Sequence, residues 1–289
     1  MGEGVKLYFL LVRRVPPVPS PVLVEVFELL RGRGFEVDGG IAEEIVVQAD
    51  YVHVAHDIYL LKSHTELALS LAGSLDAQGA NLLNPYTACA ATQNKIVASR
   101  LLRAAGVPIP RTWVTGDLDL LRSIAEEGPL IVKPHRGHRG VGIHLVRTPR
   151  DLSGLPLAEG PIMAQEYIDG ADEDVKVYVV GDDVFAVRKP FSPTSFTVPG
   201  RPSAVNPELR AIAVRCGRAL GLGLYGLDVV EGSNGPVVVD VNYFPGYKGV
   251  PGIAPLIADY IERYAAGEET LELPPPHVVD EVGAPVGPE

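Results

Sequence analysis

Two apolar runs joined by a turn constrain the fold of this chain most. Residues 225–230 and 237–241 are rich in branched apolar side chains, and the residues between them favour a turn, so they predict a β-hairpin with one buried face. Asp228 lies on its first strand, and Asp240 and Asn242 lie at the end of the second. Residues two apart on a strand point to the same face, and carboxylate and amide oxygens suit Mg²⁺. The hairpin therefore predicts a metal site; the alternative is an acid that caps a turn and an asparagine in a loop.

The size and charge of the chain exclude several classes of protein. At 289 residues it is long for one domain, so two or three lobes are expected. A hydrophobic content of 46% is typical of a globular protein, and the net charge of −11 argues against nucleic acid or a membrane surface as partner. Only two cysteines occur, without metal-type spacing, and no apolar run is long enough to span a bilayer. We expect a cytoplasmic protein, and its oligomeric state stays open, a homo-oligomer being one option.

Strands and helices alternate in the first part of the chain, which predicts an open α/β lobe over residues 1–85. Strands are expected at 5–12, 46–47, 51–54 and 81–83, and helices at 22–31 and 65–72. Residues 86–168 predict a second α/β unit. Its helices are expected at 91–105 and 118–126, and its strands at 130–133, 143–146 and 162–167.

The pattern changes to antiparallel strands in residues 169–266, which predict a sheet-rich C-terminal lobe containing the hairpin. Further strands are expected at 175–180 and 184–189, and helices at 207–220 and 254–264. Residues 267–289 are acidic and contain prolines, so we expect a loosely attached tail without a catalytic role.

A glycine-rich segment follows the strand that ends at Lys133. Gly137, Gly140 and Gly142 lie within six positions, and such glycines let successive backbone N–H groups turn toward one phosphate. Lys133 would add a point charge. No Gly-Lys-Ser/Thr sequence occurs, so this is not a Walker loop. The alternative is a glycine-rich hairpin with a purely structural role.

A second glycine pattern has a structural explanation. Residues 221–226 match G-x-G-x-x-G, but a dinucleotide-binding loop requires a strand before it and a helix after it. Here a helix precedes and a strand follows, so we predict a tight helix-to-strand turn.

Taken together, these segments resemble the ATP-grasp superfamily over residues 84–257. The hairpin 221–242 and the loop 139–143 are similar to RimK-type amino-acid ligases, which usually have Glu where this chain has Asp240. The runs 176–181 and 242–249 are similar to the inositol polyphosphate kinases of the same superfamily. The resemblance implies an ATP-grasp fold of mixed α/β and α+β type. An N-terminal pre-ATP-grasp lobe would precede it, and ATP would lie in the cleft between the central and C-terminal subdomains.

The resemblance also implies roles for individual residues. Phosphates would be bound by Lys95, Lys133 and the glycine loop. The adenine base would be bound by the strand end Gln165, Glu166, Tyr167 and Ile168. Without the resemblance, this segment is equally consistent with an ordinary strand end. Asp174 and Lys176 would lie near the ribose and phosphates. Mg²⁺, or Mn²⁺, would be held by Asp228, Asp240 and Asn242. Independently of the resemblance, we predict Arg188 as a catalytic cation together with Lys133.

Three functions remain open at this stage. The first is a carboxylate–amine ligase that acts through an acyl phosphate, the second is a kinase for an anionic small molecule, and the third is a nucleotide-binding module without turnover. An anionic acceptor is suggested by cations outside the nucleotide motifs: Lys62, His64, Arg188, Lys189, Arg201 and Lys248. The two cysteines are expected in the core. His53, His56 and Asp57 would form a second metal site or simply end a strand.

Overall fold

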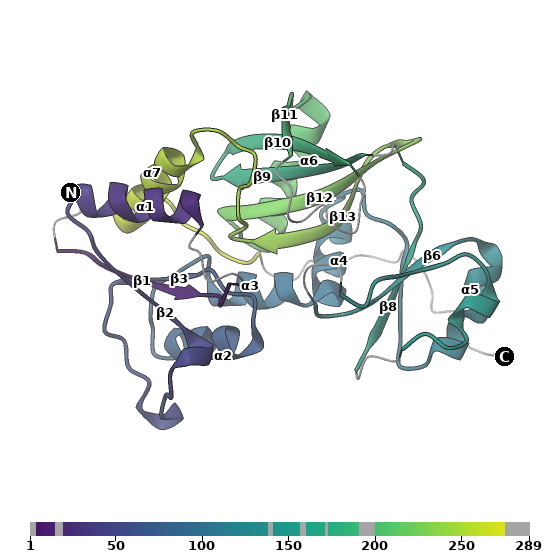
Figure 1. Cartoon of the computed structure of the whole chain (residues 1–289), viewed down its shortest axis with the longest axis horizontal. Helices are drawn as coiled ribbons and strands as arrows, with labels where there is room; N and C mark the ends of the chain where they lie inside the picture. Colours follow the sequence, from purple (N-terminus) through teal and green to yellow (C-terminus); the bar gives the residue numbers. More distant parts are fainter. Residues whose placement is uncertain are drawn as a thin grey trace.

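The computed structural model describes residues 4–14, 20–137, 141–156, 160–170, 173–190 and 200–274. Three separate sheets follow one another along the chain, and Figure 1 shows the N-terminal sheet at one end, the small central sheet at the other and the C-terminal sheet between and above them. Mixed α/β and α+β architecture was predicted from the sequence, and it is confirmed.

The N-terminal sheet is parallel, with the strand order β2-β1-β3-β4. Its elements are β1 (Lys6–Leu11), α1 (Pro21–Gly32), β2 (Glu36–Ile41), β3 (Ile58–Leu61), α2 (Glu66–Asp76) and β4 (Leu82–Leu83). All four side chains of β3 are buried, as expected for a parallel strand covered on both faces.

The strands predicted at 46–47 and 51–54 are wrong. Short 3-10 turns, Ala42–Glu44 and Ala49–Tyr51, occupy this region, and Val46 is fully exposed. The strand of this region is β2, which precedes the turns and was not predicted because its Gly39 and Gly40 have low β-propensity. A Cβ at Gly40 would lie 2.3 Å from the hydroxyl of Tyr8 on the neighbouring strand β1, so a larger residue there would force the Tyr8 side chain to move.

The predicted helix at 91–105 is instead two helices, α3 (Tyr86–Gln93) and α4 (Lys95–Ala104). Asn94 adopts an extended conformation between them, and its side-chain oxygen accepts hydrogen bonds from the backbone N–H groups of Ile96 and Val97. This is an N-cap arrangement. It makes Lys95 the first residue of α4, at the edge of the cleft described below.

The small central sheet has the strand order β5-β8-β6-β7 and is antiparallel throughout. Its elements are β5 (Thr112–Thr115), α5 (Arg122–Glu127), β6 (Leu130–Pro134), β7 (His144–Val146) and β8 (Ile162–Glu166). Strand β5 was not predicted. This sheet has a hydrophobic core of its own, whereas the N-terminal and C-terminal sheets share a single core.

The C-terminal sheet has the order β11-β10-β9-β12-β13 and is antiparallel. Its elements are β9 (Glu173–Val180), β10 (Asp183–Pro190), β11 (Arg201–Ser203), α6 (Pro207–Leu220), β12 (Leu224–Gly232), β13 (Gly235–Tyr243) and α7 (Ile253–Ala265). The predicted hairpin is β12–β13. Gly221 ends α6 with φ 66°, so the second glycine pattern is the predicted helix-to-strand turn.

Packing between lobes joins the two ends of the chain. Helix α7 packs against α1 (Figure 1), and Arg33 after α1 pairs with Asp259 at 2.6 Å and Glu262 at 2.9 Å. Helices α3 and α4 contact β13 and α6 respectively. The division at 85, 168 and 266 stays a prediction; residues 267–274 contain no helix or strand, and 275–289 lie outside the described residues. No helix of the described ranges is both long and apolar enough to cross a membrane.

Candidate active site

A row of charged side chains crosses the C-terminal sheet. Asp240 on β13 lies directly opposite Asp228 on β12, and Asp228 lies directly opposite Lys176 on β9. Directly opposed residues share a face and are close together, and Lys176 Nζ is 2.7 Å from Asp228 Oδ1. Asn242 lies two residues beyond Asp240, opposite Gly226, and so points to the same face. The three predicted metal ligands therefore come together.

A β-bulge in the hairpin connects this row to the central sheet. Asp228 pairs with Asp240 while Val229 pairs with Val238, which leaves Val239 as the extra residue. The carbonyl oxygen of Val239 accepts a hydrogen bond of 3.1 Å from Lys133 Nζ, at the end of β6. Lys95, at the start of α4, forms an ion pair with Asp240. Lysines from two other elements thus meet the acids of the hairpin.

Burial and charge shift the pKa values of these groups. Burial lowers the pKa of Lys133 to about 8, although Asp240 opposes the shift. Burial alone would raise the pKa of Asp240, but Lys95 and Lys133 outweigh it and hold that pKa below its ordinary value. Lys176 is also buried, and Asp228 more than offsets this and raises its pKa. Burial raises the pKa of Asp174. The acids and lysines of the site therefore neutralise one another.

A pocket opens where α4, β6, β8 and β13 meet. It is a narrow depression that is partly open to solvent rather than an enclosed cavity. Its polar side chains are Thr92, Lys95, Ser99, Lys133, Gln165 and Asp240. The apolar part of the lining comes from Ala98, Leu102, Ile109, Met163, Val238 and Val241. An apolar wall with a charged end suits a flat base attached to an anionic tail.

The glycine loop lies between β6 and β7. Gly142 has φ 75°, in the left-handed region that glycine adopts without strain, and a Cβ there would lie 3.2 Å from Pro134 Cδ. Arg136 of this loop pairs with Glu66 of α2 at 3.0 Å, which ties the loop to the N-terminal lobe. Gly140 lies outside the described residues.

Comparison with known proteins decides the family. A family model for the RimK-like ATP-grasp domain matches residues 92–258, more than half of the chain. The chain belongs to the RimK-like ATP-grasp family. This confirms the resemblance found in the sequence, the ATP-grasp fold, and an ATP-dependent ligase of that type, which uses ATP and a divalent metal.

Relatives and solved structures agree with this assignment. A probable alpha-L-glutamate ligase of Stutzerimonas stutzeri is 31% identical over 208 residues, 65% of this chain and 69% of that protein. A second one, of Shewanella baltica, is 29% identical over 210 residues, 66% of this chain and 70% of that protein. A RimK domain ATP-grasp protein of Sphaerobacter thermophilus has a TM-score of 0.74 at 21% identity, with 89% of this chain and 99% of that chain covered. D-cycloserine synthetase DcsG has a TM-score of 0.72 at 18% identity, with 91% and 100% covered.

The side chains predicted to hold a divalent metal in this RimK-like chain are two carboxylates and one amide, and their role as ligands stays a prediction. No group of three or more His, Cys, Asp or Glu side chains suitable for a metal occurs within the described ranges. Asp228, Asp240 and Asn242 place two carboxylates and an amide oxygen on one face of the hairpin, and this set fits a metal that also takes oxygen ligands from phosphates, as Mg²⁺ commonly does. His56 lies 3.3 Å from Asp38, and Asp57 accepts a hydrogen bond from Lys6 N, so the second metal site is not formed there.

The strand end predicted to bind adenine is only partly in the pocket. Gln165 lines it and is 4% exposed. Glu166 accepts hydrogen bonds from the backbone and side chain of Arg111 instead, and Tyr167 N donates to Pro129 O. Ile168 packs against Gly232 of β12. Glu166, Tyr167 and Ile168 thus lie where the chain crosses from the central to the C-terminal sheet, and their contact with adenine stays a prediction.

Arg188, predicted as catalytic, faces away from the charged row. Both of its terminal nitrogens lie 2.7 Å from the carboxylate of Glu231. The neighbouring residue Lys189 is paired across the sheet with Asp174 and is 2% exposed. Because side chains alternate along a strand, Lys189 shares the face of Lys176 and Asp228. The catalytic role of Arg188 stays a prediction, and Lys189 is better placed for it.

The remaining candidates divide by position. Lys62 Nζ donates a hydrogen bond of 2.7 Å to Phe244 O, and the His64 ring lies 4.2 Å from that of Tyr243, so both reach the segment directly after Asn242. Arg201 instead pairs with Glu173 at the surface. The two cysteines are fully buried, as predicted, and burial raises the pKa of each thiol.

Sequence reasoning missed some site residues. The Val239 bulge is one, because two strands of equal apolar content do not reveal an extra residue. Leu102, Ile109 and Met163 line the pocket but are indistinguishable from core residues in sequence. The start of α4 at Lys95 could have been predicted from the sequence, because Asn94 precedes it and Asn favours N-cap positions.

Proposed function

We propose that this protein is a Mg²⁺-dependent ligase that joins a carboxylate to an amine through an acyl phosphate. The observation that carries the proposal is the facing pair Asp228 and Asp240, met by lysines from three elements beside one pocket. The printed names of its relatives, two probable glutamate ligases and a D-cycloserine synthetase, support it.

The residues would divide the nucleotide between them. The apolar wall of the pocket, with Gln165, would hold the adenine base, and Lys95 and Lys133 would turn to the phosphates. Asp174 and Lys176 would lie near the ribose and phosphates, and the amides of Gly137, Gly140 and Gly142 would cover them. Asp228, Asp240 and Asn242 would hold Mg²⁺, which supplies charge neutralisation at the phosphates. Lys95 pairs with Asp240 and Lys176 with Asp228, so these lysines would share the acids with the metal.

The reaction follows from this placement. An oxygen of the acceptor carboxylate attacks the γ-phosphorus, the bond to the bridging oxygen breaks, and ADP leaves. The amine nitrogen then attacks the acyl carbon, the carbon–oxygen bond to phosphate breaks, and the nitrogen loses a proton. No protein nucleophile is required. The chain's contribution is to fix cations where negative charge spreads during phosphoryl transfer.

Trapping the acyl phosphate tests this reaction. Purified protein is incubated with Mg²⁺, ATP, hydroxylamine and a panel of amino acids and small carboxylic acids, including L-glutamate. We expect ADP release together with a hydroxamate in the wild-type protein, and neither with Asp240→Asn. A phosphate ester of a hydroxyl compound without any hydroxamate would show a kinase instead. Replacing Mg²⁺ by Mn²⁺ in the same assay identifies the preferred metal.

A further inference from the structure

The carboxyl ends of β1 and β3 form the switch point of the N-terminal sheet. In the order β2-β1-β3-β4, the chain leaves β1 for a strand on one side and leaves β3 for a strand on the other. Ligands of open parallel sheets bind outside the carboxyl ends of the strands at such a point. The two ends are adjacent here, because Lys62 N donates a hydrogen bond of 2.9 Å to Leu10 O.

Two cations occupy this switch point. Arg14 follows β1 and Lys62 follows β3. The ends of these two strands are adjacent, and burial, with a smaller contribution from the charge of Arg14, lowers the pKa of Lys62 to about 8. The Nη1 atom of Arg14 is buried and has no hydrogen-bond partner in the structure. None of the ion pairs formed by the described residues includes either side chain.

Such an arrangement favours an anion. Two neighbouring cations withdrawn from water are costly unless an opposite charge accompanies them. A carboxylate or phosphate group supplies that charge and accepts hydrogen bonds from a guanidinium and an ammonium at once. The ammonium of Lys62 has three donors, and Phe244 O uses one of them.

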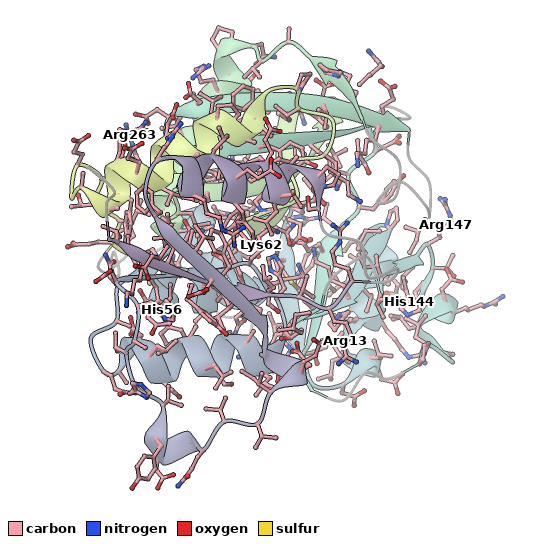
Figure 2. The ribbon with its side chains drawn as sticks, turned by 60° about the vertical axis from the view of Figure 1, so that its left-hand side comes forward. Arg13, His56, Lys62, His144, Arg147 and Arg263 are labelled. Carbon is pink, nitrogen blue, oxygen red and sulfur yellow. The ribbon has the colours of Figure 1, made fainter. Side chains whose placement is uncertain are left out.

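The pair also lies beside the proposed metal site. Lys62 Nζ donates to Phe244 O and lies 5.1 Å from the centre of the Phe244 ring, two residues beyond Asn242. Figure 2 shows Lys62 in the middle of the molecule. Tyr243, between Asn242 and Phe244, donates its hydroxyl to Ser63 O at 2.9 Å. An acceptor bound by the N-terminal lobe would therefore reach the end of β13, where the γ-phosphate is expected.

We propose that Arg14 and Lys62 form an oxyanion subsite that holds a carboxylate or phosphate group of the acceptor. This inference rests on the proposed function, because it places the acceptor of that reaction. The group held here is not the one that reacts: it anchors the acceptor and so selects molecules that carry an additional anionic group.

Calorimetry on the full chain tests the subsite. The protein is first saturated with Mg²⁺ and a non-hydrolysable ATP analogue, which fills the phosphate positions of the nucleotide, and is then titrated with L-glutamate or with inorganic phosphate. We expect at least one probe to bind. Arg14→Gln should weaken it roughly tenfold or more, the effect of removing a charge-assisted hydrogen bond, and Lys62→Gln should do the same.

Arg13→Gln is the matched control. Arg13 is the neighbouring arginine, is exposed, and pairs with Glu44 at 3.1 Å, so its loss should leave the affinity of the probe unchanged. Thermal unfolding without ligand distinguishes binding from structure: Arg14→Gln relieves repulsion with Lys62 and should melt no lower than the wild type, whereas a purely structural arginine would lower the Tm.

The outcomes separate the two proposals. Failure of the ATP analogue to bind would refute the proposed function. If the analogue binds, two results would overturn the subsite alone. One is that the wild type binds neither probe, and the other is that Arg14→Gln and Arg13→Gln bind a probe with equal affinity. Binding of L-glutamate only indicates a carboxylate-bearing acceptor, and binding of phosphate only indicates a phosphorylated one.

Discussion

The partly buried Lys62, directly after β3, predicts a dependence of stability on pH that can be measured without knowing any substrate. Burial and the charge of Arg14 lower the pKa of Lys62 from 10.5 to about 8. Between these values the unfolded chain carries a proton that the folded chain has lost, so the free energy of unfolding rises with pH. The cost of the buried charge is fully present below pH 8 and disappears as the pH approaches 10.5.

The size of the effect follows from the shift. One pKa unit corresponds to about 1.4 kcal/mol, so a pKa lowered from 10.5 to about 8 corresponds to roughly 3 kcal/mol. The assay is urea unfolding of the wild type and Lys62→Met from pH 7 to 10.5. Groups other than Lys62 cancel in the difference between the two proteins. We expect the wild type to gain roughly 3 kcal/mol on Lys62→Met across this range.

A second variant isolates the contribution of Arg14. Arg14→Gln removes the neighbouring charge, so the rise should begin at a higher pH and be smaller. Arg13→Gln, which changes an exposed arginine, should reproduce the wild-type curve. Parallel curves for the wild type and Lys62→Met would show that this ammonium titrates normally, and the argument that two cations are forced together would then be wrong.

The site predicts three further results. Asp240→Asn leaves Lys95 without its carboxylate and removes a proposed metal ligand. The rate of ADP release, measured in a coupled assay, should therefore fall by about a hundredfold or more. An unchanged rate would exclude the hairpin as the metal site. Lys189→Gln should lower the rate of ADP release. Arg188→Gln should lower the Tm and leave that rate unchanged, because Arg188 pairs with Glu231 on the other face of the sheet. A loss of rate in Arg188→Gln but not in Lys189→Gln would support Arg188 as the catalytic residue. Gly142→Ala forces a side chain into a left-handed conformation beside Pro134, so it should cost about 1 kcal/mol in urea unfolding and slow turnover, and full activity would argue that the loop does not cover phosphates.

The hairpin was predictable because its signal is local. Apolar residues of period two, a polar turn, and acids at fixed spacing determine which side chains share a face, so Asp228, Asp240 and Asn242 could be brought together on paper. The bulge at Val239 could not, because it depends on the register between two strands. That bulge frees the carbonyl that holds Lys133, so a central interaction of the site arises from pairing rather than from composition.

Long-range packing explains the errors in the N-terminal lobe. Apolar residues near position 46 resemble a strand, yet they are exposed, while β2 contains two glycines, one of which, Gly40, lies against the Tyr8 hydroxyl of the neighbouring strand. The same limit hid Arg14, which stands out in sequence only as a charge beside prolines. Its proximity to Lys62 follows from the strand order, in which β1 and β3 are adjacent although about 50 residues separate them.

The distribution of hydrophobic cores determines which groups of the site are fixed relative to one another. The N-terminal and C-terminal sheets share one core, and the central sheet has another, so Arg14, Lys62 and the acids of the hairpin are fixed relative to one another. Lys133 and the glycine loop belong to the separately packed body and reach the hairpin through the Val239 carbonyl. A change in the angle between the two bodies would therefore move the proposed phosphate-binding groups relative to the proposed metal ligands and acceptor subsite. Because charge stabilisation depends on cations being fixed within hydrogen-bond distance, the contacts between the two bodies, which include Lys133 with the Val239 carbonyl and Arg136 with Glu66, determine where the proposed phosphate-binding groups lie.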